Sequence, residues 1–141
     1  MWGGAAQIYL KDLQVLQNRV LKTIFGYPRL FHTKDIYVKN YILPLHLCIS
    51  YNCALFVYRS ILLDIHPILF PKTSFNYQLR NNVNLPKPLS YSTKHGLDGF
   101  LHRAITDYNK IKVSVRQLGD SNSFKESLKK DLLTRYSEEN V

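Results

Sequence analysis

Acidic side chains are scarce in this chain, and its aspartates are scattered singly along the sequence. Ten Asp and Glu residues stand against nineteen Lys and Arg residues. Metal-assisted polymerase or nuclease chemistry needs two or three carboxylates that converge on divalent ions. The six glycines form no loop of the kind that cradles phosphates. We therefore expect no catalytic residue and no enzyme activity in this chain on its own.

Cysteine is limited to Cys48 and Cys53. Five residues apart on a predicted helix, they point to different faces and cannot form a disulfide without distortion, which favours a reducing, intracellular location. His46 and Cys48 diverge on the same helix, and no Cys-x-x-Cys unit is present, so we expect no metal site and no cofactor. A thiol in an apolar helix is normally inert, which argues against a cysteine nucleophile.

The chain also lacks the segments that direct proteins to membranes. The first ten residues have neither the basic region nor the apolar core of a signal peptide. No charged residue occurs from Tyr41 to Tyr58, and this run raises the alternative of a membrane span. Proline, histidine, serine and asparagine interrupt the run, so we favour a buried helix and predict no membrane partner.

Positive charge is abundant and evenly spread. The formal net charge is +9, and neither terminus holds a concentrated basic tail. Such a field attracts polyanions, with nucleic acid as the first candidate and an anionic membrane surface as the second. A solvated basic surface with no partner remains the alternative.

Residues 5–25 have the periodicity of an amphipathic helix, which Gly26 would end in a left-handed conformation. Its apolar ridge, which we expect to face a core, consists of Tyr9, Leu13, Leu16, Val20 and Ile24. Its polar stripe consists of Gln7, Lys11, Gln14, Asn18 and Lys22. Gln17 falls among the apolar residues, and an amide is unexpected there.

Five further segments complete the predicted fold. A short helix should cover residues 34–41, with Thr33 as its cap and Asp35 in its first turn. A long apolar helix over residues 45–63 should be the central element. Residues 66–98 are rich in proline, asparagine and tyrosine and read as irregular, with room for one or two short strands. A helix near residues 100–111 should be followed by an amphipathic C-terminal helix that Ser123 and Glu126 cap reciprocally.

These features predict a mainly α fold. It is a small helical domain with a long buried central helix, an irregular Pro/Asn/Tyr-rich middle and a C-terminal amphipathic helix. We divide the single predicted domain into residues 1–26, a helix; 27–65, a helical core; 66–98, an irregular connection; and 99–141, a C-terminal helical segment.

A collinear series of short motifs resembles one known family. The series is WGG, YLKDLQVLQNRVLKTIFG, LPL opening a long apolar helix that ends near YR, then YQLR, YNKI, VRQ and SFKESLKKDLLTRY. It is similar to the region downstream of the reverse transcriptase core in jockey-type non-LTR (LINE-like) retrotransposons. The resemblance runs from Trp2 to about Tyr136, and it rests on the order of the motifs because no single motif is strong.

The resemblance implies that the first 26 residues are thumb-like and that the rest is the connection region beyond the thumb. The chain would then be a non-catalytic C-terminal fragment of an RNA-directed DNA polymerase that helps bind the RNA/DNA template-primer duplex. Its partners would be the backbone of that hybrid and the polymerase palm, whose aspartates would precede Trp2. The nucleic-acid-binding residues that the resemblance implies are Lys11, Gln14, Gln17, Asn18, Arg19 and Lys22.

Alternatives remain open at this point. Gln17 could instead bond a backbone carbonyl at the edge of a core, as most buried amides do. Arg80 and Arg116 could contact phosphates or pair with internal carboxylates, and the suitability of guanidinium for buried pairing favours the structural role. The segment from Tyr108 to Lys112 departs from the Trp-Asn-x-Leu-Pro pattern of the family by losing its proline. The rival hypothesis for the whole chain is a free-standing basic helical module that binds nucleic acid or protein, and a third is a remnant with no selected role.

Overall fold

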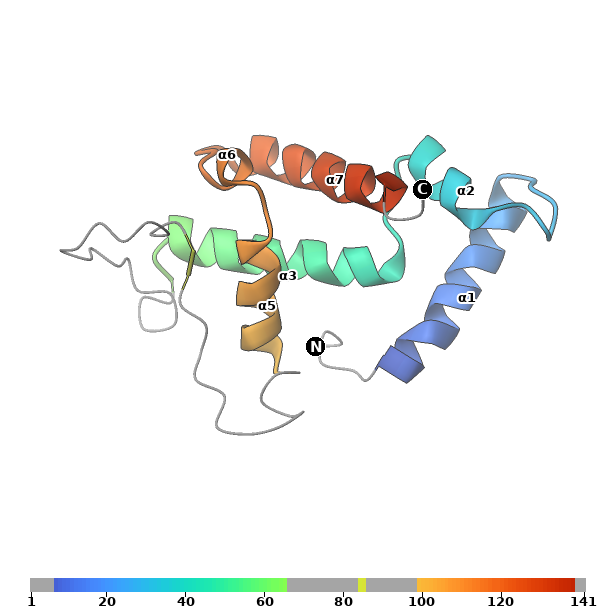
Figure 1. The fold of residues 1–141 in the computed structure, drawn as a ribbon, viewed down its shortest axis with the longest axis horizontal. Coiled ribbons are helices and arrows are strands. Elements are labelled where there is room, and N and C mark those ends of the chain that lie inside the picture. Colours follow the sequence, from blue (N-terminus) through green and yellow to red (C-terminus); the bar gives the residue numbers. More distant parts are fainter. Residues whose placement is uncertain (1–6, 66–83, 86–98, 139–141) are drawn as a thin grey trace. The chain divides into compact units, whose positions relative to one another are not determined.

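The computed structural model describes residues 7–65, 84–85 and 99–138, and these residues are mainly helical, as the sequence predicts. Helix accounts for 73% of them, and the described part contains no strand. The helices, labelled as in Figure 1, are α1 (Gln7–Ile24), α2 (Thr33–Lys39), α3 (Leu45–Leu62), α5 (Phe100–Asn109), α6 (Val113–Arg116) and α7 (Ser121–Glu138). The one or two short strands considered for residues 66–98 fall almost entirely outside the described residues. Within that segment the structure describes residues 84–85, and these do not form a strand.

The chain divides into two compact units. The first comprises residues 1–51 and 129–141, and the second comprises residues 52–128. The boundary falls within α3 and within α7, so each of these helices contributes residues to both units. The predicted subdivision at residues 26, 65 and 98 remains a prediction.

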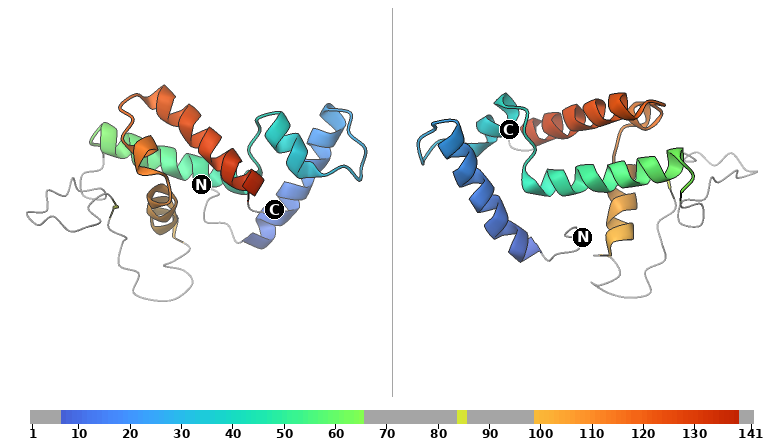
Figure 2. Two further views of the ribbon diagram at one scale, coloured as in Figure 1. Left: turned by 45° about the horizontal axis from the view of Figure 1, so that its top comes forward. Right: turned by 180° about the vertical axis from the view of Figure 1, so that it is seen from behind.

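In the first unit, α1 and α2 contact each other and lie side by side (Figure 2). The core of this unit is formed by Leu21, Ile36 and Tyr37, and four partly buried residues pack against it: Tyr27, Phe31, Ile42 and Tyr136. The Tyr27 and Phe31 rings stack at 4.4 Å between centroids. The Lys34 ammonium donates to the Ser137 carbonyl at 2.7 Å, a position where a cation complements the C-terminal end of α7.

Three helices end in the same way. After α1, Gly26 has a φ of 67°, the Tyr27 N–H donates to the Lys22 carbonyl and the Gly26 N–H to the Thr23 carbonyl. This is the left-handed termination predicted for Gly26. Tyr41 after α2 and Asp64 after α3 occupy the same position with φ values of 55° and 54°, where a side chain is less favourable than glycine.

In the second unit, the core is built from α3, α5 and the first half of α7. Tyr58 stacks on Phe124 with ring centroids 3.8 Å apart, and its hydroxyl donates to the Leu118 carbonyl at 2.6 Å. The Phe100 ring meets Phe56 edge-on at 5.3 Å. Helical spacing in the sequence places Phe100, Leu101, Ala104, Ile105 and Tyr108 on one face of α5, and Ala104, Ile105 and Tyr108 are buried.

Helix α3 is long and apolar enough to cross a membrane by length and composition alone. The core helix of a soluble protein meets the same criteria, so the observation is weak. Six residues of α3 are buried within the protein, which fits the predicted central helix.

Two predicted helix caps are wrong. Thr33 is the first residue of α2, and the N-cap is His32, which makes no side-chain capping bond. The N-cap of α7 is Asp120 rather than Ser123. Its carboxylate accepts from the Ser123 N–H at 2.8 Å and from the Ser123 hydroxyl at 2.9 Å. Aspartate is as good an N-cap as serine and adds a charge that favours a helix N-terminus, so the helix begins three residues earlier.

The Asp120 cap predicts a pH-dependent stability. Hydrogen bonds from Ser123 hold the pKa of the Asp120 carboxyl below its ordinary value. A lowered folded-state pKa gives stability that is present above the ordinary pKa and is lost as the pH falls through the folded-state value. Asp120→Asn keeps an acceptor but removes the charge. Its melting temperature should therefore lie below that of the parent chain at neutral pH, and the gap should close below about pH 4. A gap that is unchanged in acid would contradict this role.

Candidate nucleic-acid interface

All six residues predicted to bind nucleic acid lie on α1, but they do not share one environment. At 100° per residue, Lys11 and Lys22 lie within about 40° of Asn18 around the helix, and Arg19 lies farther around, away from Gln14 and Gln17. The three amide side chains are partly buried, whereas Lys11 and Arg19 are exposed. The amides therefore differ from Lys11 and Arg19 in burial, although Lys11 borders Asn18 on the same polar stripe.

The amides of α1 form a hydrogen-bond network with α2. The Gln14 side-chain nitrogen lies 2.8 Å from the Tyr37 hydroxyl and about as close to two neighbours on its own helix, 3.0 Å from the Gln17 oxygen and 3.1 Å from the Asn18 oxygen. The Tyr37 hydroxyl in turn donates to the Asn18 oxygen at 2.7 Å. Because Tyr37 is almost fully buried, this network ties α1 to the core of the first unit.

The same amides cap the start of α3. The Leu45 N–H donates to the side-chain oxygens of Gln14 at 2.8 Å and Gln17 at 2.9 Å. The Gln17 nitrogen donates to the Leu43 carbonyl at 3.1 Å. Leu45 is the first residue of α3, and Pro44 before it has no side chain that could accept a hydrogen bond. The first N–H groups of any helix need such partners from elsewhere, and here α1 supplies them.

Burial of Tyr37 keeps its hydroxyl protonated. Desolvation raises the pKa of Tyr37 to about 12, although the hydrogen bond from Gln14 acts in the opposite direction. The nearby Tyr136 and Cys48 side chains add smaller effects that also raise this pKa. At neutral pH the hydroxyl is thus available as a donor to Asn18 and as an acceptor from Gln14.

The cations of α1 have different surroundings from the amides. Lys11 and Arg19 are exposed. Lys22 is partly buried, and its ammonium donates to the Arg29 carbonyl in the turn after α1. Lys11 and Arg19 therefore present their charge to solvent, and Lys22 also fastens the end of the helix.

The apolar ridge of α1 is turned outward, and the core-facing interpretation of it is wrong. The exposed fractions are 46% for Leu13, 56% for Leu16, 47% for Val20 and 67% for Ile24. Only Leu21, at the flank of the ridge, is buried. The amide network and Leu21 occupy the inward side instead. The Tyr9 side chain, the fifth predicted member of the ridge, lies outside the described set.

Arg116 has an internal role in the second unit. It donates to the Asn84 side chain at 3.0 Å and lies over the Tyr108 ring at 5.8 Å. The Asn109 side chain pairs with both the N–H and the carbonyl of Leu85 at 2.9 Å. Arg80 lies outside the described residues.

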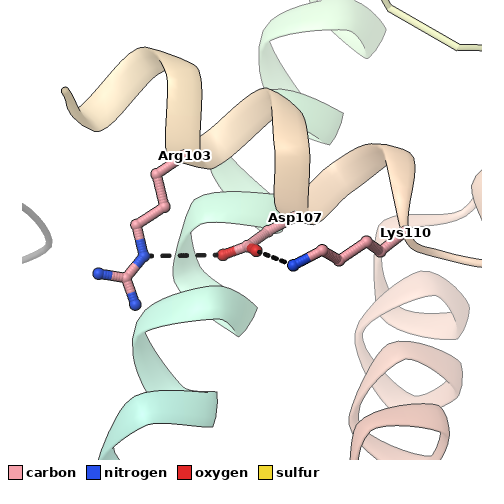
Figure 3. Close-up of polar contacts among 3 residues, drawn as sticks. All are labelled: Arg103, Asp107 and Lys110. Carbon is pink, nitrogen blue, oxygen red and sulfur yellow. Dashed lines mark ion pairs between the residues drawn. The ribbon is translucent and has the colours of Figure 1, made fainter. Parts of the chain in front are cut away.

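An ion-pair cluster lies on α5 (Figure 3). Asp107 contacts Arg103, four residues before it on α5, at 3.9 Å, and Lys110, just after the end of α5, at 3.5 Å. Burial raises the pKa of the neighbouring Cys53 thiol, and the charge of Asp107 acts in the same direction. Burial likewise raises the pKa of Cys48. Both thiols are thus poorly nucleophilic.

Among the described residues, no set of three or more His, Cys, Asp or Glu side chains is arranged to hold a metal ion.

The alternative in which Gln17 bonds a backbone carbonyl is confirmed by its bond to Leu43, but sequence reasoning missed that Gln14 and Gln17 cap α3, although the sequence held a signal for it. The segment before α3, Ile42 to Pro44, contains no serine, threonine, aspartate or asparagine that could cap the helix. A long helix without its own cap needs acceptors from another element, and two glutamines on a neighbouring helix are suitable.

Comparison of the chain with protein-family models, with curated proteins and with solved structures found no match.

Proposed function

We propose that this chain is a non-catalytic nucleic-acid-binding segment of a retrotransposon RNA-directed DNA polymerase, and that it helps hold the RNA/DNA template-primer duplex. The observation that carries the proposal is the exposed, cationic side of α1 with Lys11 and Arg19, on a chain whose net charge is +9. The collinear motifs that resemble the thumb and connection of such polymerases supply the identity of the parent enzyme. In this proposal the palm of the parent enzyme provides the catalytic aspartates.

The structure changes which atoms should make the contacts. The polar atoms of Gln14, Gln17 and Asn18 are already hydrogen-bonded within the protein. The proposed contacts are therefore made by Lys11, Arg19 and Lys22 to phosphates, which carry no sequence information. The amides act indirectly, because they fix the orientation of α1 and thus the direction in which its cations point.

Binding to a phosphate backbone predicts weak, sequence-indifferent and salt-sensitive association. Each phosphate contact releases counterions and contributes about 0.7–0.9 to the slope of log affinity against log salt. Lys11→Ala with Lys22→Ala should therefore lower the slope by about 1.4–1.8 for an RNA/DNA hybrid. The measurement is fluorescence anisotropy with a labelled hybrid over a range of salt concentrations.

The matched control is Lys39→Ala with Lys130→Ala. Both lysines are exposed and lie on other helices, and the control removes the same net charge. An equal loss of slope in the two double variants would show that the basic surface as a whole binds, not α1. No binding to any duplex at low salt would refute the proposed function.

A free-standing module that binds protein is the second candidate. The outward apolar ridge of α1 favours it, since soluble proteins rarely expose contiguous apolar patches without use. Reading the genomic frame upstream of Met1 separates the two candidates. An open frame that encodes a tyrosine-x-aspartate-aspartate loop supports the polymerase fragment, and a promoter directly before Met1 supports the module.

The proposed location is intracellular. Cys48 and Cys53 are thiols in α3, and neither forms a disulfide. This fits the reducing interior of a cell.

A further inference from the structure

The apolar ridge of α1 leaves a row of apolar side chains exposed on the first unit. It is defined by Leu13, Leu16, Val20 and Ile24. Its members are spaced by three and four residues, so they form one continuous stripe along the helix. Val15 is also exposed, but it lies on a different side of the helix from this stripe. The ridge thus has the form of a helix-packing seam.

We propose that two copies of this chain associate through their α1 helices, with the apolar ridges packed antiparallel. The two-fold symmetry of such a pair makes Leu13 of one copy face Leu16 of the other, and the reverse.

Charges along the edge of the ridge select this arrangement. Asp12 and Arg19 are both exposed and lie on the same edge, seven residues apart. In the antiparallel pair, Asp12 of each copy falls beside Arg19 of the other, which gives two ion pairs. Pairs at these flanking positions set the orientation and register of helix partners more than they add affinity.

Other arrangements of the same ridges lose these ion pairs. Sliding the antiparallel pair by one heptad places Leu16 against Val20, and it brings the two Arg19 side chains together, which is repulsive. A parallel pair places Asp12 beside Gln17 and Arg19 beside Ile24, with no charge complement. The charge pattern therefore favours one register.

The cationic side of α1 remains accessible in this pair. Lys11 and Lys22 project from the side of the helix opposite the ridge. A pair of copies can therefore present both sets of lysines to a polyanion, and self-association does not depend on the proposed function. Four side chains that are about half exposed offer less area than the roughly 800 Å² per partner of a standard interface. We therefore expect a weak dimer whose population rises with protein concentration.

The experiment is sedimentation velocity on the full chain across the micromolar range. The parent chain should shift from monomer to dimer as the concentration rises. Leu16→Glu should remain a monomer, and Val15→Glu, the matched control on the same helix, should dimerise as the parent does. Both positions are exposed, so neither substitution should unfold the chain.

Charge exchange tests the register. Asp12→Arg alone or Arg19→Asp alone places like charges together and should weaken the dimer roughly tenfold or more. The double variant that exchanges them should restore the parent behaviour. A chain that stays monomeric at every concentration, a double variant that is not restored, or equal loss with Val15→Glu would each overturn the proposal. If the chain stays monomeric but still binds the hybrid, the dimer proposal fails and the proposed function is unaffected.

Discussion

Phe124→Ala should destabilise the second unit by about 3–5 kcal/mol, the cost of truncating a fully buried aromatic side chain. Phe124 has no exposed surface, and its ring lies flat on Tyr58 with centroids 3.8 Å apart and an interplanar angle of 5°. The cavity would lie between α3 and α7, beside the Tyr58 ring. Because Tyr58 also donates to the Leu118 carbonyl, loss of the stack should loosen the segment before α7.

Urea unfolding followed by circular dichroism measures the total loss, and hydrogen exchange assigns it to a unit. Exchange should rise in α5 and in the part of α3 that belongs to the second unit. Glu126→Ala, an exposed change on the same helix, is the control and should stay within about 0.5 kcal/mol of the parent. A loss below 1 kcal/mol for Phe124→Ala would mean that the stack contributes little.

Phe124 also shows what apolar periodicity predicts well. In α7 the residues at four-residue steps include the fully buried Phe124 and Leu128, and in α5 the predicted face is the buried one. The span of α3 was predicted to within one residue, from Pro44 at its start and a run of apolar residues. These helices bury one apolar side, so the pattern in the sequence and the packing in the fold agree.

Helix α1 shows where the same method gives a wrong answer. Its apolar ridge and its amides both have helical spacing, and periodicity cannot decide which side faces the rest of the unit. The decision came from hydrogen bonds to residues distant in sequence, the Tyr37 hydroxyl and the Leu45 N–H. The inward amides satisfy several polar groups at once, and each of these would cost about 1–3 kcal/mol if it were buried without a partner.

The caps were mispredicted for a related reason. Both Asp120 and Ser123 satisfy the sequence rules for an N-cap, and they differ only in where the chain enters the helix. In the structure, the Asp120 carboxylate accepts from the N–H of Ser123, three residues later. The local sequence does not determine which of these two residues is the N-cap.

Gln14→Ala combined with Gln17→Ala should destabilise the first unit by about 2–4 kcal/mol. The double change leaves the Leu45 N–H, the Leu43 carbonyl and the Tyr37 hydroxyl without their partners on these two residues. A buried donor or acceptor that loses its partner costs about 1–3 kcal/mol, and water can satisfy part of the loss at the partly buried Leu45. Hydrogen exchange in α2 and at the start of α3 is the direct measurement, with urea unfolding for the total.

Two controls separate a structural role of these amides from direct contact with nucleic acid. Lys11→Ala removes an exposed cation of the same helix and should leave stability within about 0.5 kcal/mol of the parent. A double-mutant cycle between Gln14→Ala and Tyr37→Phe should give a coupling of about 0.5–3 kcal/mol in the absence of any nucleic acid. If the glutamines contact the duplex instead, the double alanine variant should keep its stability and lose only affinity. A stable variant with weak binding would thus return the amides to the interface, whereas an unstable one fixes them as the connection that holds α1, α2 and the start of α3 together.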